Sequence, residues 1–195
     1  MFVLVASIEA VFPFLWGWDK FCFQLCYLSN WLTFATIILI TLQIVASNDP
    51  NINNRPGLLA AVHICFEFTF IFNLCVISIY WTIIHPTEIL KYEGFAQIFY
   101  MYYSHIAPAF VTLCCYLLLD VRFKASHANP FVLTSLVYGV INYAITKYTG
   151  KPIYDFLDWK DYKSLVLFLC LNACFYAFYM AIVRLSFWLK PPSIK

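Results

Sequence analysis

Between Phe21 and Ser47 the chain carries no charged side chain, and this stretch is longer than the roughly 20 apolar residues that a helix needs to cross a bilayer. Similar runs recur along the 195 residues, of which 63% are hydrophobic and 11% are charged. Soluble domains are about half apolar and about a quarter charged, so a water-soluble fold would leave too much apolar surface uncovered. The sequence therefore predicts an integral membrane protein.

The apolar runs predict about six membrane-spanning helices. We expect them at residues 2–17, 21–47, 58–84, 95–119, 131–146 and 164–189. The first run is short and holds Glu9 and Pro13, so five spans is the alternative. Only helices and closed barrels satisfy the backbone in lipid, and these runs are too long for barrel strands of about ten residues. The predicted fold is an all-α bundle forming one transmembrane domain over residues 1–195.

Charge and cysteine placement limit the partners and cofactors. The net charge is only +2, with basic residues scattered through the loops, which argues against a nucleic-acid partner and leaves membrane lipids. Six of the eight cysteines lie inside apolar runs, where a thiol behaves as a small hydrophobe. The pairs Cys22/Cys26 and Cys170/Cys174 lack the Cys-x-x-Cys spacing typical of zinc and redox sites. We expect packing roles for the cysteines, and neither a metal nor a cofactor.

Ionisable side chains at bilayer depth are costly and mark candidate functional positions. The expected spans contain Glu9, His63, Glu67 and His105. His63 and Glu67 are four residues apart, so they share one helix face and can hydrogen-bond each other. They are interpreted first as a polar clasp between helices. The alternative is a proton relay or a metal half-site completed by His105 and Glu9.

His105 lies three residues before Pro108, which is expected to free the Ser104 carbonyl and kink the helix. Kinks in membrane helices commonly line cavities, and a neutral imidazole there can act as general base for a hydroxyl nucleophile. The hydroxyl candidates within the spans are Thr33, Thr36, Thr41, Thr69, Ser78 and Thr82. Most of them are expected to bond back to their own helix, and periodicity alone selects none.

Three aromatic-rich segments of the chain carry a recognisable pattern. The first is LCYLSNWLTFATIILI, residues 25–40, and the second is CVISIYWTIIHP, residues 75–86, a hydrophobic helix that holds a Tyr-Trp pair. The third is HANPFVLTSLVYGVINYAITKYTGKPIYDFLDW, residues 127–159, with a helix, a Gly turn and an IY…LDW segment. From about Cys26 to Trp159, the chain thereby resembles the androgen-induced gene / rolling-stone family of multispanning membrane proteins.

The resemblance implies a function and a site. Members of the androgen-induced branch are intramembrane hydrolases of fatty-acid esters of hydroxy fatty acids, with a Thr nucleophile and a His. The WLTF segment places Thr33 where the family has its Thr, and His105 is the only histidine in the span that carries the family's His. His105 precedes Asp120 by fifteen residues, whereas the family spacing is about ten, a place held here by Phe110.

Two other functions stay open beside a threonine-dependent lipid-ester hydrolase. A small chain of apolar helices also suits a non-catalytic accessory subunit of a larger membrane complex, such as a mitochondrial respiratory complex, with other membrane-protein subunits as partners. A proton- or metal-handling protein would use Glu9, His63, Glu67 and His105. The expected location is an endomembrane or the plasma membrane, with the mitochondrial inner membrane as the alternative.

Overall fold

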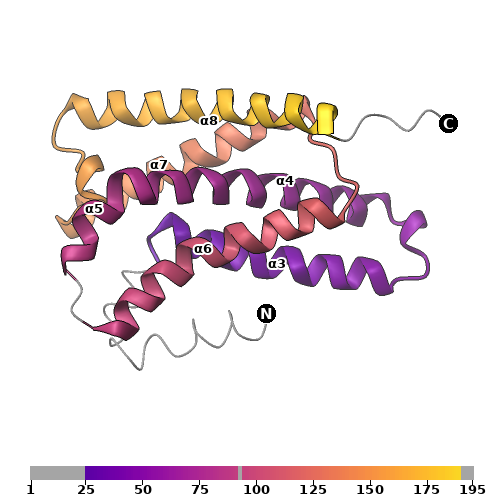
Figure 1. The fold of residues 1–195 in the computed structure, drawn as a ribbon. Helices are drawn as coiled ribbons and strands as arrows, with labels where there is room; N and C mark the ends of the chain where they lie inside the picture. Colours follow the sequence, from indigo (N-terminus) through magenta and orange to yellow (C-terminus); the bar gives the residue numbers. More distant parts are fainter. Residues whose placement is uncertain (1–24, 92–93, 190–195) are drawn as a thin grey trace. The chain divides into compact units, whose positions relative to one another are not determined.

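Five helices in the described part of the chain, residues 25–91 and 94–189 of this computed structural model, are long and apolar enough to span a membrane (Figure 1). They are α3 (Leu28–Asn48), Pro56–Thr87, α6 (Phe95–Leu118), Ala125–Thr149 and α8 (Tyr162–Leu189). These residues contain no β-strand. The predicted all-α membrane protein is confirmed, while the expected span at residues 2–17 lies outside the described residues.

The second span is built from three consecutive helical segments. α4 (Pro56–Ile79) is followed by a π-helical turn, Tyr80–Ile84, and then by the short helix α5 (His85–Glu88). Pro56 opens α4, where the missing N–H of proline costs nothing because the first helical N–H groups have no partner inside the helix. The predicted span at 58–84 is therefore present and extends a few residues further at both ends.

The chain divides into two compact units, Met1–Leu119 and Asp120–Lys195. In the first, α3, α4 and α6 contact one another in pairs. α3 and α4 are joined by a short loop with an ion pair between Arg55 and Asp49, 3.1 Å apart, so the two helices run antiparallel. This division into two units does not test whether residues 1–195 form one transmembrane domain, so that expectation stays a prediction.

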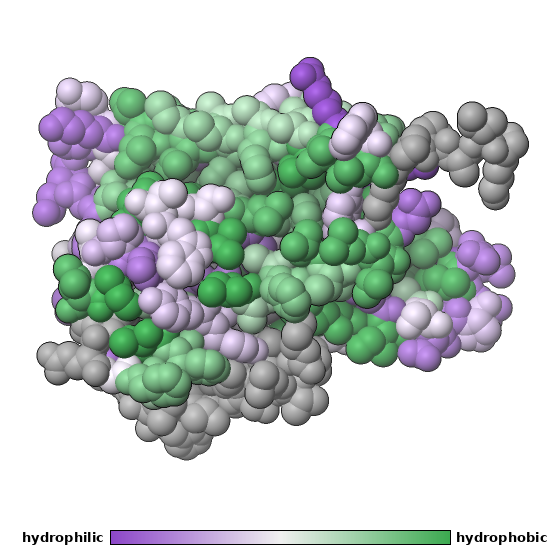
Figure 2. Space-filling model, in the orientation of Figure 1, coloured by the Kyte–Doolittle hydropathy of each residue, from purple (hydrophilic) through white to green (hydrophobic). Residues whose placement is uncertain are grey.

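Polar side chains lie beside apolar ones inside the first unit, and large apolar side chains also cover its outside. On α3, Thr33 and Thr36 are buried while Ile38 and Ile44 are more than half exposed. On α4, Glu67 and Asn73 are buried. Figure 2 shows hydrophobic residues along the lengths of the helices and hydrophilic ones gathered mainly near their ends. An apolar outside with buried polar groups is expected where lipid is the solvent, because apolar surface meets apolar tails and polar groups find partners between helices.

The second unit is a helical hairpin of α7 (Ala128–Thr149) and α8, which contact each other. A Cβ atom at Gly139 of α7 would collide with the Phe168 ring of α8, so glycine permits this close approach. Gly150 ends α7 with a φ of 68°, the left-handed conformation that glycine adopts without strain.

The fourth span is longer than the predicted 131–146. It covers Ala125–Thr149, with a 3-10 turn at Ala125–His127 leading into α7. Pro130 suggested a loop in the sequence, but it lies in the first turn of α7, where its missing N–H breaks no helical hydrogen bond.

Candidate functional site

His105 belongs to an aromatic cluster formed by the π-helical turn, α5 and α6, with Tyr80 at its centre. Its ring stacks on Tyr80 with 3.8 Å between the ring centroids and an angle of 17° between the planes. Its Nδ1 atom lies 2.7 Å from the carbonyl oxygen of Met101 and 3.2 Å from the Ser104 hydroxyl. Stacking fixes the plane of the imidazole, and the hydrogen bond fixes its rotation within that plane. His105 is therefore held in one orientation from two helices.

The hydrogen bond to Met101 also determines the tautomer of the neutral ring. A carbonyl oxygen can only accept, so Nδ1 must carry the hydrogen. The other nitrogen, Nε2, then presents a lone pair, and among the described residues nothing binds it. An imidazole that donates from Nδ1 and keeps the Nε2 lone pair is in the form that a general base requires.

The π-helical turn places Tyr80 and His85 on the same side of their helix. Residues five apart point about 140° away from each other on an α-helix, whereas the i→i+5 pattern of a π turn stacks them. The backbone N–H of His85 donates to the Tyr80 carbonyl, as this pattern requires. Pro86 gives the physical cause, because its ring has no N–H and would clash with the carbonyl four residues earlier in an α-helix.

His85 and Tyr102 form the outer part of the cluster, near the end of the second span. His85 Nε2 lies 3.1 Å from the Tyr102 hydroxyl, and Trp81 stacks on Tyr102 with 5.6 Å between ring centroids. The Tyr80 ring also contacts the edge of His85 at 5.7 Å. Two imidazoles therefore flank one tyrosine, the first deeper in the span and the second closer to its end.

Thr33 and His105 lie at matching heights on neighbouring helices. α3 and α6 contact each other, and Cys115 Sγ lies 3.7 Å from Gln43 Oε1. Thr33 is ten residues before Gln43, and His105 is ten residues before Cys115. Both helices follow α4 in the opposite direction, so they run parallel, and each of these residues lies about 15 Å from that contact along its helix.

The Thr33 hydroxyl does not hydrogen-bond His105 in the described structure. It donates to the Ser29 carbonyl at 3.1 Å, and the Thr33 side chain is buried. The helices thus bring the two predicted catalytic residues to one level without joining them, and the assignment stays a prediction. Phe110, at the place expected from family spacing, is 57% exposed, whereas His105 is partly buried against Tyr80.

The other hydroxyl candidates mostly bond back to their own helices, as expected. Thr36, Thr41, Ser78 and Thr82 each donate to the carbonyl four residues earlier, at 2.7–2.9 Å. Thr69 instead lies 3.9 Å from the sulfur of Cys65. Thr36 differs from the rest because its oxygen also accepts a hydrogen bond, from Asn73 Nδ2 of α4 at 3.2 Å.

His63 and Glu67 form the predicted pair on one face of α4. His63 Nε2 lies 2.7 Å from Glu67 Oε1, and Glu67 is fully buried. His105 does not complete a metal site there, because it stacks on Tyr80, which is thirteen residues or about 20 Å further along the same span. Glu9, the fourth member of the alternative site, lies outside the described residues.

The second unit has a separate polar cluster around Trp159, in the connector between α7 and α8. Its indole Nε1 donates to Asn142 Oδ1 at 2.7 Å, its backbone N–H donates to Ser164 Oγ at 3.0 Å, and its carbonyl accepts from Lys147 Nζ at 2.8 Å. Trp159 has a φ of 55°, a left-handed conformation that is rare outside glycine. These three hydrogen bonds stabilise Trp159 in a backbone conformation that is otherwise unfavourable for a residue with a side chain.

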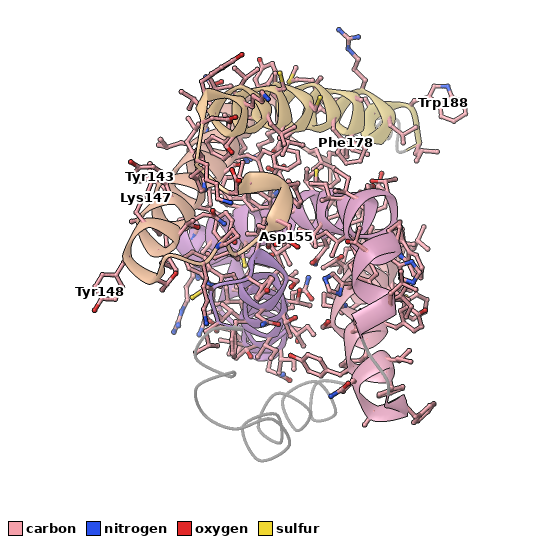
Figure 3. All side chains as sticks on the ribbon, turned by 90° about the vertical axis from the view of Figure 1, so that its left-hand side faces the viewer. Tyr143, Lys147, Tyr148, Asp155, Phe178 and Trp188 are labelled. Atoms are coloured by element: carbon pink, nitrogen blue, oxygen red, sulfur yellow. The ribbon has the colours of Figure 1, made fainter. Side chains whose placement is uncertain are left out.

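Asp158 connects this cluster to the start of α8. Its Oδ1 accepts from the Lys160 backbone N–H at 3.1 Å and from the Ser164 hydroxyl at 3.0 Å. The backbone hydrogen bond, the hydroxyl and the nearby Lys160 ammonium all stabilise the charged carboxylate, so the pKa of Asp158 is lowered. Figure 3 shows Tyr143 and Lys147 together on α7, with Tyr148 pointing away from the helix.

Sequence reasoning did not select Tyr80, His85 or Asn73 as site residues. The signal for the first two was present in YWTIIHP, because a proline after a histidine inside a long apolar run disturbs the helix and permits a π turn. Asn73 is a polar residue in the middle of a span, and such a position is itself a signal of a functional residue.

No protein-family model, curated protein or solved structure matches the chain.

Proposed function

We propose that this membrane protein is a hydrolase of lipid esters, with the Thr33 hydroxyl as nucleophile and the His105 imidazole as general base. The observation that carries the proposal is the fixed orientation of His105, whose Nδ1 is anchored on Met101 while Nε2 is open at the level of Thr33. The resemblance to the androgen-induced gene / rolling-stone family agrees with these roles. It also suggests fatty-acid esters of hydroxy fatty acids as substrates.

The reaction requires that the Thr33 hydroxyl release the Ser29 carbonyl and donate its hydrogen bond to Nε2 of His105. Threonine in a helix already divides its population between two rotamers. The substrate's ester would reach these buried groups from the lipid, since the outer surfaces of α3 and α6 are apolar.

A fluorophosphonate probe, which reacts with activated hydroxyls, tests the proposal on the purified full chain. The unchanged protein should be labelled at Thr33, Thr33→Ala should lose labelling, and Thr33→Ser should keep it. Thr41→Ala is the matched control, because Thr41 lies on the same helix and makes the same kind of hydrogen bond to its own backbone. Equal labelling of Thr33→Ala and the unchanged chain would falsify the assignment.

A non-catalytic subunit is the second candidate, and one observation favours it. α8 is the least buried of the five spans within the described structure, so most of its surface is available to neighbouring subunits or to lipid. We infer that, in this case, the chain would leave its native membrane as part of a larger assembly. Native mass measurement in mild detergent tests this, and a stable monomer without co-purifying proteins would count against it.

A further inference from the structure

Asn73 is a buried amide with unused hydrogen-bonding capacity in the first unit. Its side chain is 4% exposed, and its Nδ2 atom donates to Thr36 Oγ1 at 3.2 Å. The hydrogen of the Thr36 hydroxyl goes to the Leu32 carbonyl at 2.7 Å, so Thr36 is satisfied by this arrangement. A side-chain amide has two N–H hydrogens, and the described residues supply an acceptor for only one of them. A buried N–H without an acceptor costs free energy in an apolar interior, and a functional role would explain why the chain keeps it.

The Asn73 amide lies within about one helical turn of Thr33. Thr36, its hydrogen-bond partner, is three residues from Thr33 on α3, or about 4.5 Å along the helix axis. Because α3 and α4 run antiparallel, going from Thr36 toward Thr33 is the same direction as going from Asn73 toward Tyr80. Tyr80 carries the stacked His105. Along the helix axes, Thr33 thus lies between the level of the spare Asn73 amide N–H and the level of the His105 ring.

We infer that the Asn73 amide donates the hydrogen bond that stabilises the oxyanion when Thr33 attacks an ester carbonyl. This inference rests on the proposed function and adds a third catalytic residue to it. The charge on the carbonyl oxygen exists only in the transition state and the tetrahedral intermediate, where a fixed donor in a water-poor site has its largest effect. Asparagine provides a neutral donor that costs less to bury in a bilayer than a cation does.

The reaction then follows in two balanced halves. Thr33 Oγ1 bonds to the carbonyl carbon, its proton moves to His105 Nε2, and the π electrons move to the carbonyl oxygen beside Asn73 Nδ2–H. The bond to the alcohol oxygen breaks, His105 returns the proton to that oxygen, and the alcohol leaves an acyl group on Thr33. Water attacks the acyl carbon in the same way, giving the free carboxylic acid and the original threonine.

The experiment compares labelling rates of full-length variants with the fluorophosphonate probe, whose phosphoryl oxygen takes the place of the oxyanion. Asn73→Leu removes the donor, and the maximal rate of Thr33 labelling should fall by about 10²- to 10³-fold, as for loss of one oxyanion donor. The probe concentration for half-maximal rate should change little. Thr36→Val is the matched control, because it removes the other partner of the same hydrogen bond while leaving the amide in place.

The possible results separate this inference from the proposed function. If Asn73 only clasps α3 to α4, Asn73→Leu and Thr36→Val will slow labelling equally, and the oxyanion role is overturned. If thermal unfolding shows that the Asn73→Leu variant is not folded, the Asn73→Thr variant replaces it, since the threonine hydroxyl can hydrogen-bond back to its own helix. Undiminished labelling in the folded variant also overturns the role while leaving the hydrolase intact. If Thr33 in the unchanged chain is not labelled, both proposals fall.

Discussion

The polar clusters around His105 and Trp159 use hydrogen bonds in opposite ways. Each polar atom of the Trp159 backbone and indole has a partner within the second unit, namely Ser164, Lys147 and Asn142. His105 instead has one nitrogen bonded to Met101 and the other open among the described residues. A residue whose polar atoms all have hydrogen-bond partners fixes a conformation, whereas a fixed imidazole with a free lone pair can accept a proton. The second cluster therefore has an architectural arrangement, whereas the first has the arrangement that the proposed reaction requires.

Replacing His105 by glutamine should have the largest effect on activity and a small one on stability. Loss of a general base lowers rates by about 10²- to 10⁴-fold, so Thr33 labelling by the fluorophosphonate probe should fall within this range. Thermal unfolding of the detergent-solubilised protein should change little, because glutamine can still donate to the Met101 carbonyl. If the rate is unchanged, the difference between the two clusters disappears.

Replacing Trp159 by alanine should have the opposite profile. It removes a ring packed against Tyr143 and Phe168 together with one side-chain hydrogen bond, and losses of this kind cost about 3–5 kcal/mol. The melting temperature should fall, and protease should cut the connector between α7 and α8 sooner. Trp188→Ala is the control, since Trp188 is 78% exposed at the end of α8. Equal effects of the two variants would show that the Trp159 cluster has no architectural role.

Replacing Tyr102 by phenylalanine should have a smaller effect. The change deletes the hydroxyl that pairs with His85, which is worth about 1 kcal/mol. A modest fall in melting temperature is expected, with the aromatic packing on Trp81 retained. Tyr148→Phe serves as the control because Tyr148 is 93% exposed and lies in the second unit. A matching loss in the control would mean that the His85 hydrogen bond contributes nothing.

Acid should weaken the Trp159 cluster slightly through Asp158. Its pKa is lowered by the folded structure, so its charged form stabilises the fold above the ordinary aspartate pKa of about 3.9. This stabilisation is lost as the pH falls through the lower folded value. Melting temperatures measured between about pH 6 and pH 3 should therefore decline less for Asp158→Asn than for the unchanged chain, with Asp120→Asn as the control. Identical declines in all three proteins would remove Asp158 from the explanation.

The sequence was sufficient to predict the spans because hydrophobic length is a local property. The described helices agree with five of the six expected runs, and His63 and Glu67 meet as their four-residue spacing predicts. The start of α7 was predicted too late because the residues up to Pro130 were counted with the preceding loop, although a proline in the first turn of a helix breaks no hydrogen bond.

The His105 site was only partly predictable, because its contacts come from two separate spans. The sequence selected His105 as an ionisable residue at bilayer depth, but not the ring that stacks on it. That contact depends on how α4 packs against α6 and on a π turn of five residues, neither of which follows from hydrophobic periodicity. Likewise, the pairing of Asn73 with Thr36 joins residues 37 positions apart and needed the helix packing to become visible.

The π-helical turn has a consequence for anyone who draws or redesigns this helix. It accommodates one residue more than an α-helical turn does, so residues after Ile84 are out of phase with those before Tyr80. A single helical wheel drawn from Pro56 to Thr87 would put His85 on the wrong side, and two wheels are needed. Deleting one residue of this turn, such as the exposed Ile83, should remove the extra residue and leave Tyr80 and His85 four positions apart, so that both stay on one side of an ordinary α-helix. A deletion within α4 should instead rotate the end of the span by about 100° and carry His85 away from Tyr102, although length and apolarity would hardly change.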